Sequence, residues 1–271
     1  MLPIDEKESY PDFGKQFTVD SDIDGYWGDP ELLKDIVHPF SVDEIADKVV
    51  MDVGSGSGRI VSMLSHYRPS RIVAIEPSEA IVVAMRNNEN APCPIDFHNV
   101  KGEEIALENE MDLVFSLGVL HHAPGAEAIV QRIHAALKPG GKCVVWLYGY
   151  EGNEQYVAIS NAARRVTKIL PDAALRVLCH GLNGLCHGYL FLCRYLNMPM
   201  KGYFLNVFSK FSWRKQCYVI FDQLNPSYSK YYRGEEVEAL LKGAGFRVIA
   251  LHHRHQYSWT AIGVKEGLRK G

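Results

Sequence analysis

The fold of this chain is indicated most clearly by the stretch Val49-Val50-Met51-Asp52-Val53-Gly54-Ser55-Gly56-Ser57-Gly58-Arg59. Four apolar residues and one acid run directly into three glycines at alternating positions, and the apolar pattern of a helix follows. This order predicts a buried strand, a tight turn and the start of a helix. The glycines allow positive φ angles in the turn and let a ligand approach the main chain closely.

A second short apolar strand ends in an acid. Arg71-Ile72-Val73-Ala74-Ile75 is followed by Glu76, which lies 18 residues after Gly58. A carboxylate at such a strand tip can accept hydrogen bonds from both ribose hydroxyls of a nucleoside. The alternative interpretation of Glu76 is a charge at the start of the next helix, which Ser78 would cap. The glycine loop that precedes Glu76 favours the ribose role.

Three later motifs follow the glycine loop and Glu76 along the chain. They are Met111–His122, then Leu137-Lys138-Pro139-Gly140-Gly141 before the apolar run Val144–Leu147, then Gly243-Ala244-Gly245-Phe246. Together with the G-x-G-x-G loop and Glu76, they resemble the class I methyltransferases that use S-adenosylmethionine (SAM). The resemblance covers residues 45–150 well and residues 232–264 moderately. Residues 1–44 and 151–230 match no motif of that family.

The order of apolar runs predicts an α/β fold with a mostly parallel sheet and helices on both faces. The expected strands are 48–53, 71–76, 94–99, 111–116, 142–148, 246–252 and 258–264, and the expected helices are 57–67, 78–88, 124–137 and 234–243. The resemblance implies a doubly wound, Rossmann-like sheet in the order 3-2-1-4-5-7-6, with the last strand antiparallel. It further implies an insertion between strands 5 and 6.

We therefore expect four segments in this chain. Residues 1–44 would form an N-terminal lid, 45–150 the SAM-binding core, 151–230 a helical cap, and 231–271 the end of the core sheet. The cap contains a sevenfold repeat, Leu178-Cys179-His180, Leu185-Cys186-His187 and Leu192-Cys193-Arg194. Leucines at 178, 182, 185, 192 and 196 then share one helix face.

Several interpretations of the cap compete. A Cys/His metal site is disfavoured, because seven-residue repeats place ligands about 10 Å apart along a helix. Charged and histidine side chains interrupt a membrane span, although a helix on a membrane surface remains open. The favoured interpretation is a helix that roofs an apolar acceptor pocket, or that pairs with a second copy through residues 172–197.

Composition excludes some classes of function. The 271 residues carry a formal net charge of −3, which does not favour binding to nucleic acid. The N-terminus is acidic and has no apolar signal segment. Six cysteines without a Cys-x-x-Cys pair indicate thiols in a reducing compartment, so we expect a cytoplasmic protein without stable membrane insertion.

The resemblance assigns cofactor contacts to particular residues. It implies that Asp52 and the Gly54–Gly58 backbone hold the methionine part of SAM, that Glu76 holds the ribose, and that Pro77, Gly102 and Glu103 border the adenine. The family usually has an acid where Gly102 aligns, and Glu103 is the candidate to replace it. The full set is Asp52, Gly54, Ser55, Gly56, Gly58, Glu76, Pro77, Gly102, Glu103, Ser116 and Leu117.

Methyl transfer from a sulfonium is an in-line displacement that needs no metal, so we expect none. The protein must align the acceptor and exclude water, and a hydroxyl acceptor benefits from a base such as histidine. The catalytic candidates are His122, His121, Arg254 and His255, with Arg254 alternatively holding an acidic acceptor. The substrate-binding candidates are Tyr26, Trp27, Tyr148, Tyr150, His253 and Tyr257. The polar run Asp222–Pro226, which precedes Tyr228 and Tyr231, is a further candidate for an acceptor-side loop.

The sequence thus favours a SAM-dependent methyltransferase that acts on a small molecule, at oxygen, with a bulky or partly apolar acceptor. Three alternatives stay open. They are a nitrogen or carbon acceptor, a non-catalytic SAM-binding protein, and a nicotinamide-dependent oxidoreductase. Arg59 argues against the last, because a dinucleotide loop has a glycine at that position of its G-x-G-x-x-G pattern.

Overall fold

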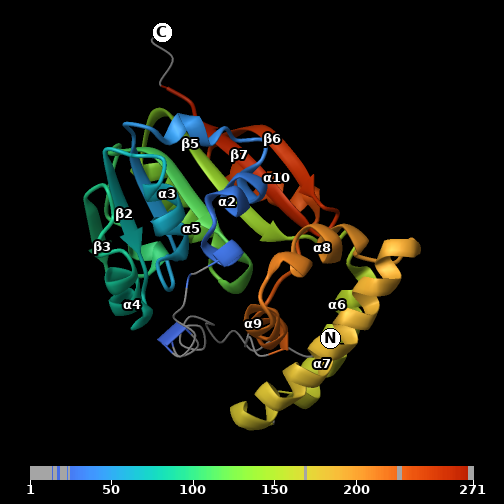
Figure 1. Cartoon of the computed structure of the whole chain (residues 1–271). Coiled ribbons are helices and arrows are strands. Elements are labelled where there is room, and N and C mark those ends of the chain that lie inside the picture. The colour runs from blue at the N-terminus through green and yellow to red at the C-terminus, as the bar shows by residue number, and fades with distance from the viewer. Residues whose placement is uncertain are drawn as a thin grey trace.

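The structure, a computed structural model, describes Gly14, residues 17–18, Ile23, and residues 25–167, 170–224 and 228–267. Its centre is a seven-stranded sheet in the order β3-β2-β1-β4-β5-β7-β6, as predicted (Figure 1). The strands are β1 (Val49–Val53), β2 (Arg71–Ile75), β3 (Ile95–His98), β4 (Met111–Leu117), β5 (Leu137–Tyr148), β6 (Phe246–Arg254) and β7 (Ser258–Lys265). β7 runs antiparallel to both of its neighbours, and the pairs formed by the first five strands are parallel.

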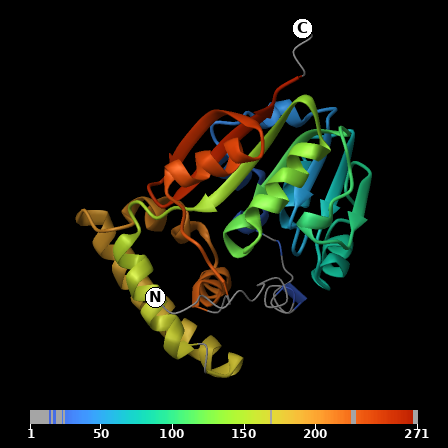
Figure 2. The ribbon, with the colours of Figure 1, turned by 180° about the vertical axis from the view of Figure 1, so that it is seen from behind.

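Helices cover both faces of the sheet. They are α2 (Pro30–Val37), α3 (Arg59–Ser65), α4 (Ala80–Asn87), α5 (Ala126–Ala136) and α10 (Gly234–Gly243), with short 3-10 turns η1 (Gly25–Gly28), η2 (Val42–Ile45), η3 (Gly102–Glu104) and η4 (Leu120–His122). One apolar core joins α5 and α10 to the face seen in Figure 2, and a second joins α2 and α3 to the opposite face. Apolar burial on both sides explains why β1 and β2 are almost continuously apolar.

Local signals in the sequence set several helix boundaries. Asp29 caps α2, since its side chain accepts a hydrogen bond from the Glu31 N–H at 2.8 Å, and Pro30 occupies the first turn, where its missing N–H costs nothing. At the other end of the core, α10 stops at Gly243, and Gly245 has a φ of 95° before β6 begins. The start of α2 and the end of α10 thus show the usual preference for proline in the first turn of a helix and glycine just after its last turn.

The fifth strand differs from the prediction at its start. We expected it at 142–148, with Leu137–Gly141 as a helix stop, but β5 begins directly at Leu137. Leu137 pairs with Met111, and the register then shifts before Leu113 pairs with Lys142. The Pro-Gly-Gly segment is therefore an irregular first part of the strand, where Gly140 has a φ of 82°.

The segment between β5 and α10 is helical. It contains α6 (Glu154–Thr167), α7 (Asp172–Tyr195), α8 (Lys201–Asn206), η5 (Phe208–Lys210) and α9 (Trp213–Leu224). Figures 1 and 2 show α6 and α7 at the outer edge of the molecule, and α9, which packs against both, lies between them and the sheet.

Only Leu182 of the five leucines that share one face of α7 packs against α9. Leu175 and Cys179 pack against Cys217 and Phe221 of α9, and Cys193 is also fully buried. The leucines at 178, 185, 192 and 196 are instead exposed. The buried side of α7 thus combines the small, apolar cysteines with Leu175 and Leu190, and the other four leucines lie on the neighbouring face.

A charged contact joins α2 to the end of β6. The Arg254 side chain is buried, and its Nε donates to Asp35 Oδ2 at 3.1 Å while a second guanidinium nitrogen pairs with the same carboxylate. His255 Nε2 lies 2.9 Å from Asp35 Oδ1. Burial acts to raise the pKa of Asp35, but the hydrogen bond from His255 and the charge of Arg254 outweigh it and lower the pKa from 3.8 to about 2.

We predict that Asp35→Ala destabilises the fold by on the order of 3 kcal/mol, because it leaves the buried Arg254 charge without its partner. Because the folded-state pKa of Asp35 is depressed, its contribution is complete above the unfolded value of about 4 and is lost as the pH falls toward about 2. Urea unfolding measures both effects. The exposed Asp43→Ala is the matched control, and equal losses in the two variants would show that the pair contributes nothing.

Candidate functional site

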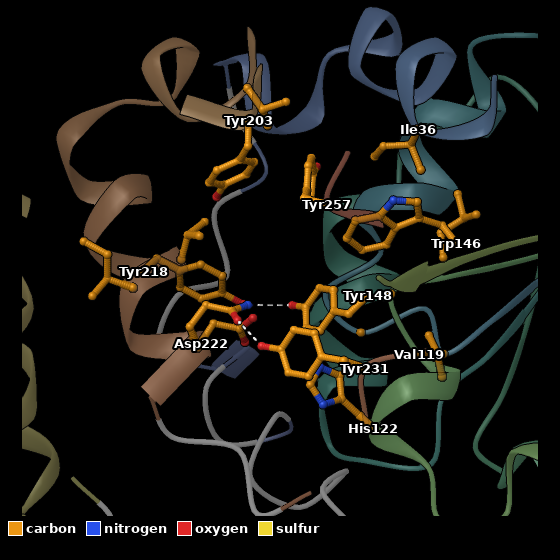
Figure 3. Close-up of a pocket in the computed structure, with 18 of the residues that line it drawn as sticks. Ile36, Val119, His122, Trp146, Tyr148, Tyr203, Tyr218, Asp222, Tyr231 and Tyr257 are labelled. Carbon is orange, nitrogen blue, oxygen red and sulfur yellow. Dashed lines mark hydrogen bonds between the residues drawn. The ribbon is translucent and has the colours of Figure 1, made fainter. Parts of the chain in front are cut away.

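A cavity of about 1240 Å³ opens at the carboxyl ends of β1, β2, β4 and β5. The glycine loop after β1, Glu76 after β2 and Leu117 at the end of β4 line one part of it. Aromatic side chains from β5 and the helical insertion line the other part, shown in Figure 3. Ligands of open parallel sheets bind at this edge, so the cavity is the candidate site.

The loop after β1 requires its glycines. Gly54, Gly56 and Gly58 have φ angles of 81°, 52° and 79°, in the left-handed region that side chains disfavour. A Cβ on Gly54 would lie 2.4 Å from a methyl carbon of Val119. The loop therefore presents bare backbone to the cavity, as the sequence predicted.

Glu76 connects the loop to the second strand. Its carboxylate is buried, accepts a hydrogen bond from the Gly56 N–H at 2.8 Å, and accepts two more from the N–H and hydroxyl of Ser78 at 2.9 and 2.5 Å. The Ser78 hydroxyl also accepts from the Ala80 N–H at 3.2 Å, at the start of α4. The two interpretations of this region are thus compatible, since Ser78 serves the helix start while Glu76 faces the cavity.

Asp52 lies beneath the loop and does not line the cavity. It is fully buried, and its Oδ2 has no hydrogen-bond partner among the described residues. Burial raises the pKa of Asp52 to about 7, against the opposing hydrogen bond of Ser55 and the charge of Arg59. This placement does not support the direct methionine contact expected from the sequence.

Some of the other cofactor candidates line the cavity and some do not. Those that line the cavity are Gly54, Ser55, Gly56, Glu76, Pro77, Gly102, Glu103 and Leu117. Gly58 and Ser116 do not line it: Gly58 packs against Ala84 and Asn88, and the Ser116 side chain is fully buried. The lining set combines main-chain groups, the two carboxylates of Glu76 and Glu103, and apolar walls, which fits a nucleoside bearing a charged amino-acid part.

His122 lines the cavity at the end of β4 (Figure 3). Its Nδ1 lies 2.9 Å from the carbonyl oxygen of Tyr228. Because a carbonyl can only accept, Nδ1 carries the proton, and in the neutral ring Nε2 carries the lone pair. Burial lowers the pKa of His122 to about 4, against the Tyr228 hydrogen bond, so the ring is neutral at pH 7.

Three other catalytic candidates have different surroundings. His121 is fully buried outside the cavity lining and stacks on Tyr148 with ring centroids 3.7 Å apart, so its expected role as a base is not supported. His255 faces Asp35 and does not line the cavity. Arg254 does line it, but its charge is paired with Asp35, which leaves it poorly suited to hold an acidic acceptor.

The substrate-binding candidates also divide. Trp27, Tyr148 and Tyr257 line the cavity, whereas Tyr26, Tyr150 and His253 do not. Tyr26 packs on Phe211 at a centroid distance of 5.8 Å, Tyr150 lies under the guanidinium of Arg233, and His253 stacks on Trp259 at 4.2 Å. These three side chains contact other parts of the protein and do not face the proposed substrate.

A hydrogen-bonded group of tyrosines surrounds Gln223 in the aromatic part of the cavity. Gln223 Nε2 donates to the Tyr148 hydroxyl at 2.7 Å, and its Oε1 accepts from Tyr156 at 2.9 Å and Tyr231 at 3.3 Å. Asp222, Gln223 and Tyr231 belong to the polar-aromatic region flagged in the sequence, of which residues 225–227 lie outside the described residues. Figure 3 shows Tyr148 and Tyr231 pointing toward this group.

Some cavity residues carried no signal that identified them in the sequence. Tyr156, Tyr203 and Tyr218 lie on the insertion helices, for which no motif was available. The sequence marks Arg59 only as a departure from the dinucleotide pattern. Its guanidinium lies 4.1 Å from the ring centroid of Trp27 and donates to the Trp27 carbonyl at 3.2 Å, beside the glycine loop.

Known proteins resemble the sheet region of this chain. A family model described as "Methyltransferase domain" matches residues 51–145. A ubiquinone biosynthesis O-methyltransferase from Pseudomonas syringae pv. tomato is 30% identical over 101 residues, which are 36% of this chain and 43% of that protein. A tRNA U34 carboxymethyltransferase from Pseudoalteromonas atlantica is 27% identical over 121 residues, which are 44% of this chain and 38% of that protein.

The chain thus spans about two fifths of the length of these relatives. Among solved structures, a Burkholderia thailandensis 1,6-didemethyltoxoflavin-N1-methyltransferase with bound S-adenosylhomocysteine has a TM-score of 0.57. It is 14% identical and covers 94% of this chain and 86% of that chain, a likeness of fold. The matched segment begins in β1 and ends in β5, so it contains the glycine loop, Glu76 and His122. Residues 51–145 therefore match a methyltransferase domain, and the sheet has the fold of a SAM-dependent methyltransferase.

Proposed function

We propose that this protein transfers a methyl group from SAM to an oxygen of a bulky, partly apolar small molecule. The observation that carries the proposal is a single cavity that joins two environments. One is the glycine loop with Glu76, and the other is an aromatic chamber with the neutral His122 at its edge. The name of the ubiquinone biosynthesis relative supports an oxygen acceptor.

The cofactor part of the cavity fits SAM by its donor set. The main chain of Gly54–Gly56 would hold the charged amino-acid part, and Glu76 would accept from the ribose hydroxyls. SAM supplies a methyl group that the sulfonium charge already activates, so the protein has to align the acceptor and exclude water. The helical insertion performs much of that exclusion, because residues of α6, α8 and α9 close the other side of the cavity.

His122 suits the role of general base. Its Nδ1 is held by the Tyr228 carbonyl, which keeps the lone pair on Nε2, the position from which a ring accepts a proton. An acceptor hydroxyl in the chamber would pass its proton to Nε2 as its oxygen bonds to the methyl carbon. Tyr148 stays protonated, since burial raises its pKa well above 10.0, and serves as a hydrogen-bonding wall.

The acceptor chamber selects for an aromatic or apolar body with few polar groups. Its walls include Trp146, Tyr203, Phe208 and Tyr218. Gln223 and its tyrosine partners are the polar groups that would orient a hydroxyl or carbonyl on the acceptor. We infer that residues 151–230 act as the acceptor-binding cap.

We predict that Glu76→Gln weakens SAM binding by at least tenfold, because an amide cannot replace the charge-assisted hydrogen bonds to the ribose. Isothermal calorimetry measures the affinity. The exposed Glu79→Gln, three residues along the same turn, is the control and should bind SAM like the unmodified protein. Because Glu76 also holds the loop, unfolding temperatures are compared in parallel. Unchanged affinity in a folded Glu76→Gln protein would remove the ribose role.

We predict that His122→Ala lowers turnover about a hundredfold or more while SAM affinity stays within a few-fold, because the base is lost and the cofactor part is not. Transfer of radiolabelled methyl to a panel of alkyl-substituted phenols and catechols measures turnover. In the unmodified protein, turnover should fall as the pH drops through about 4, where His122 takes up its proton. The exposed His98→Ala is the control, and full activity of His122→Ala would exclude the base.

A further inference from the structure

Helix α7 has a long exposed apolar face. The side chains of Val177, Leu185 and Tyr195 are 73%, 72% and 73% exposed, and Leu178, Phe191 and Leu192 are exposed beside them. Positions 177, 178, 181, 184, 185, 188, 191, 192 and 195 recur at steps of three and four, so they share one helix face. The glycines at 181, 184 and 188 fall on this face and have open space around them. This apolar face, defined by residues 177–195, extends along almost the whole helix.

Basic residues border the apolar face. Arg176, His180, His187 and Arg194 recur at steps of four and seven, so they form one stripe between the apolar face and the buried side of α7. Between Asp172 and Asp222 the sequence contains six Lys or Arg and no Asp or Glu, in a chain with 32 acidic residues. Trp213 is exposed at the same border and stacks on His187 with centroids 5.3 Å apart. The charge of the insertion is thus opposite in sign to that of the chain.

An apolar face with a basic border and an aromatic residue is the pattern of a helix that lies in the surface of an anionic bilayer. No helix in the described part of the chain is long and apolar enough to cross a membrane. An RNA-binding face would expose Lys and Arg, whereas the apolar face has none between Val177 and Phe191. The composition of the face therefore favours lipid over nucleic acid.

The proposed acceptor cavity reaches the same edge of the molecule. Ile159 of α6 and Leu185 of α7 both line the cavity, and both are about 70% exposed. Figures 1 and 2 show both α6 and α7 at the outer edge of the molecule, away from the sheet. A bilayer in contact with the apolar face would therefore lie beside an opening of the cavity.

We propose that α7 docks this protein on an anionic lipid bilayer, with its apolar face in the interface and the exposed Arg194 directed at lipid headgroups. The docking places the cavity opening at the bilayer, so that an apolar acceptor enters from the lipid phase. The second part of this proposal rests on the proposed function, but the docking itself does not. A second copy of the chain is the other occupant that residues 172–197 suggest, and the experiment separates the two.

The test is flotation of the full chain with vesicles of phosphatidylcholine alone or with added phosphatidylglycerol, in the absence of SAM. We expect binding to the anionic vesicles that weakens as salt is added. The double variant Val177→Glu/Phe191→Glu should reduce the bound fraction by about tenfold, because it places two charges in the interface. Val82→Glu/Ile249→Glu changes exposed apolar residues on α4 and β6 in the same way and should bind like the unmodified protein.

Failure to float with anionic vesicles, or equal flotation of the two double variants, would overturn the docking. Two other results, each without vesicle binding, would also overturn it. In the first, light scattering shows that the unmodified protein is a dimer and that Val177→Glu/Phe191→Glu is a monomer. In the second, the protein retards transfer RNA in a gel-shift experiment. Glu76→Gln should float normally, which separates a failure of docking from a failure of the methyltransferase proposal. Acceptor entry from lipid predicts that Val177→Glu/Phe191→Glu raises KM for a vesicle-borne phenol but not for a water-soluble one.

Discussion

The close approach of backbone to ligand at the end of β1 is the constraint on which the site depends. Gly54 has no room for a Cβ beside Val119, and the Gly56 N–H is held by the carboxylate of Glu76. The loop after the first strand and the acid after the second therefore form one rigid unit. That unit fixes one end of the cavity, and everything that the acceptor meets is arranged relative to it.

The other end of the cavity is built by segments far apart in the sequence. Residues Tyr228–Tyr232 run beside the end of β5, where the Tyr232 N–H donates to the Tyr148 carbonyl at 2.8 Å. This contact brings the Tyr228 carbonyl to His122 and Tyr231 to Gln223. The tautomer of the proposed base and the polar group of the acceptor chamber thus depend on the same short segment.

Apolar periodicity predicted most element boundaries, because these depend on local spacing, whereas the resemblance to the methyltransferase family implied the sheet order and the cofactor candidates, most of which line the cavity. They predicted side-chain roles less well. Arg254 and His255 were candidates for the catalytic site, yet both face Asp35 of α2 at the turn between β6 and β7. His121 and His122 are adjacent in sequence, but one ring stacks behind Tyr148 and the other lines the cavity. Composition and periodicity do not determine which of two neighbouring histidine side chains points into the cavity.

The sequence by itself determined the buried strands, the glycine turn and the acid at the second strand tip, since each is set by local backbone preference and apolar periodicity. It also determined the lack of acidic residues between Asp172 and Asp222. Only the tertiary structure decided which face of α7 is buried, because both its cysteine and its leucine positions are apolar at helical spacing. Which face packs depends on the shape of α9, and that information lies elsewhere in the chain.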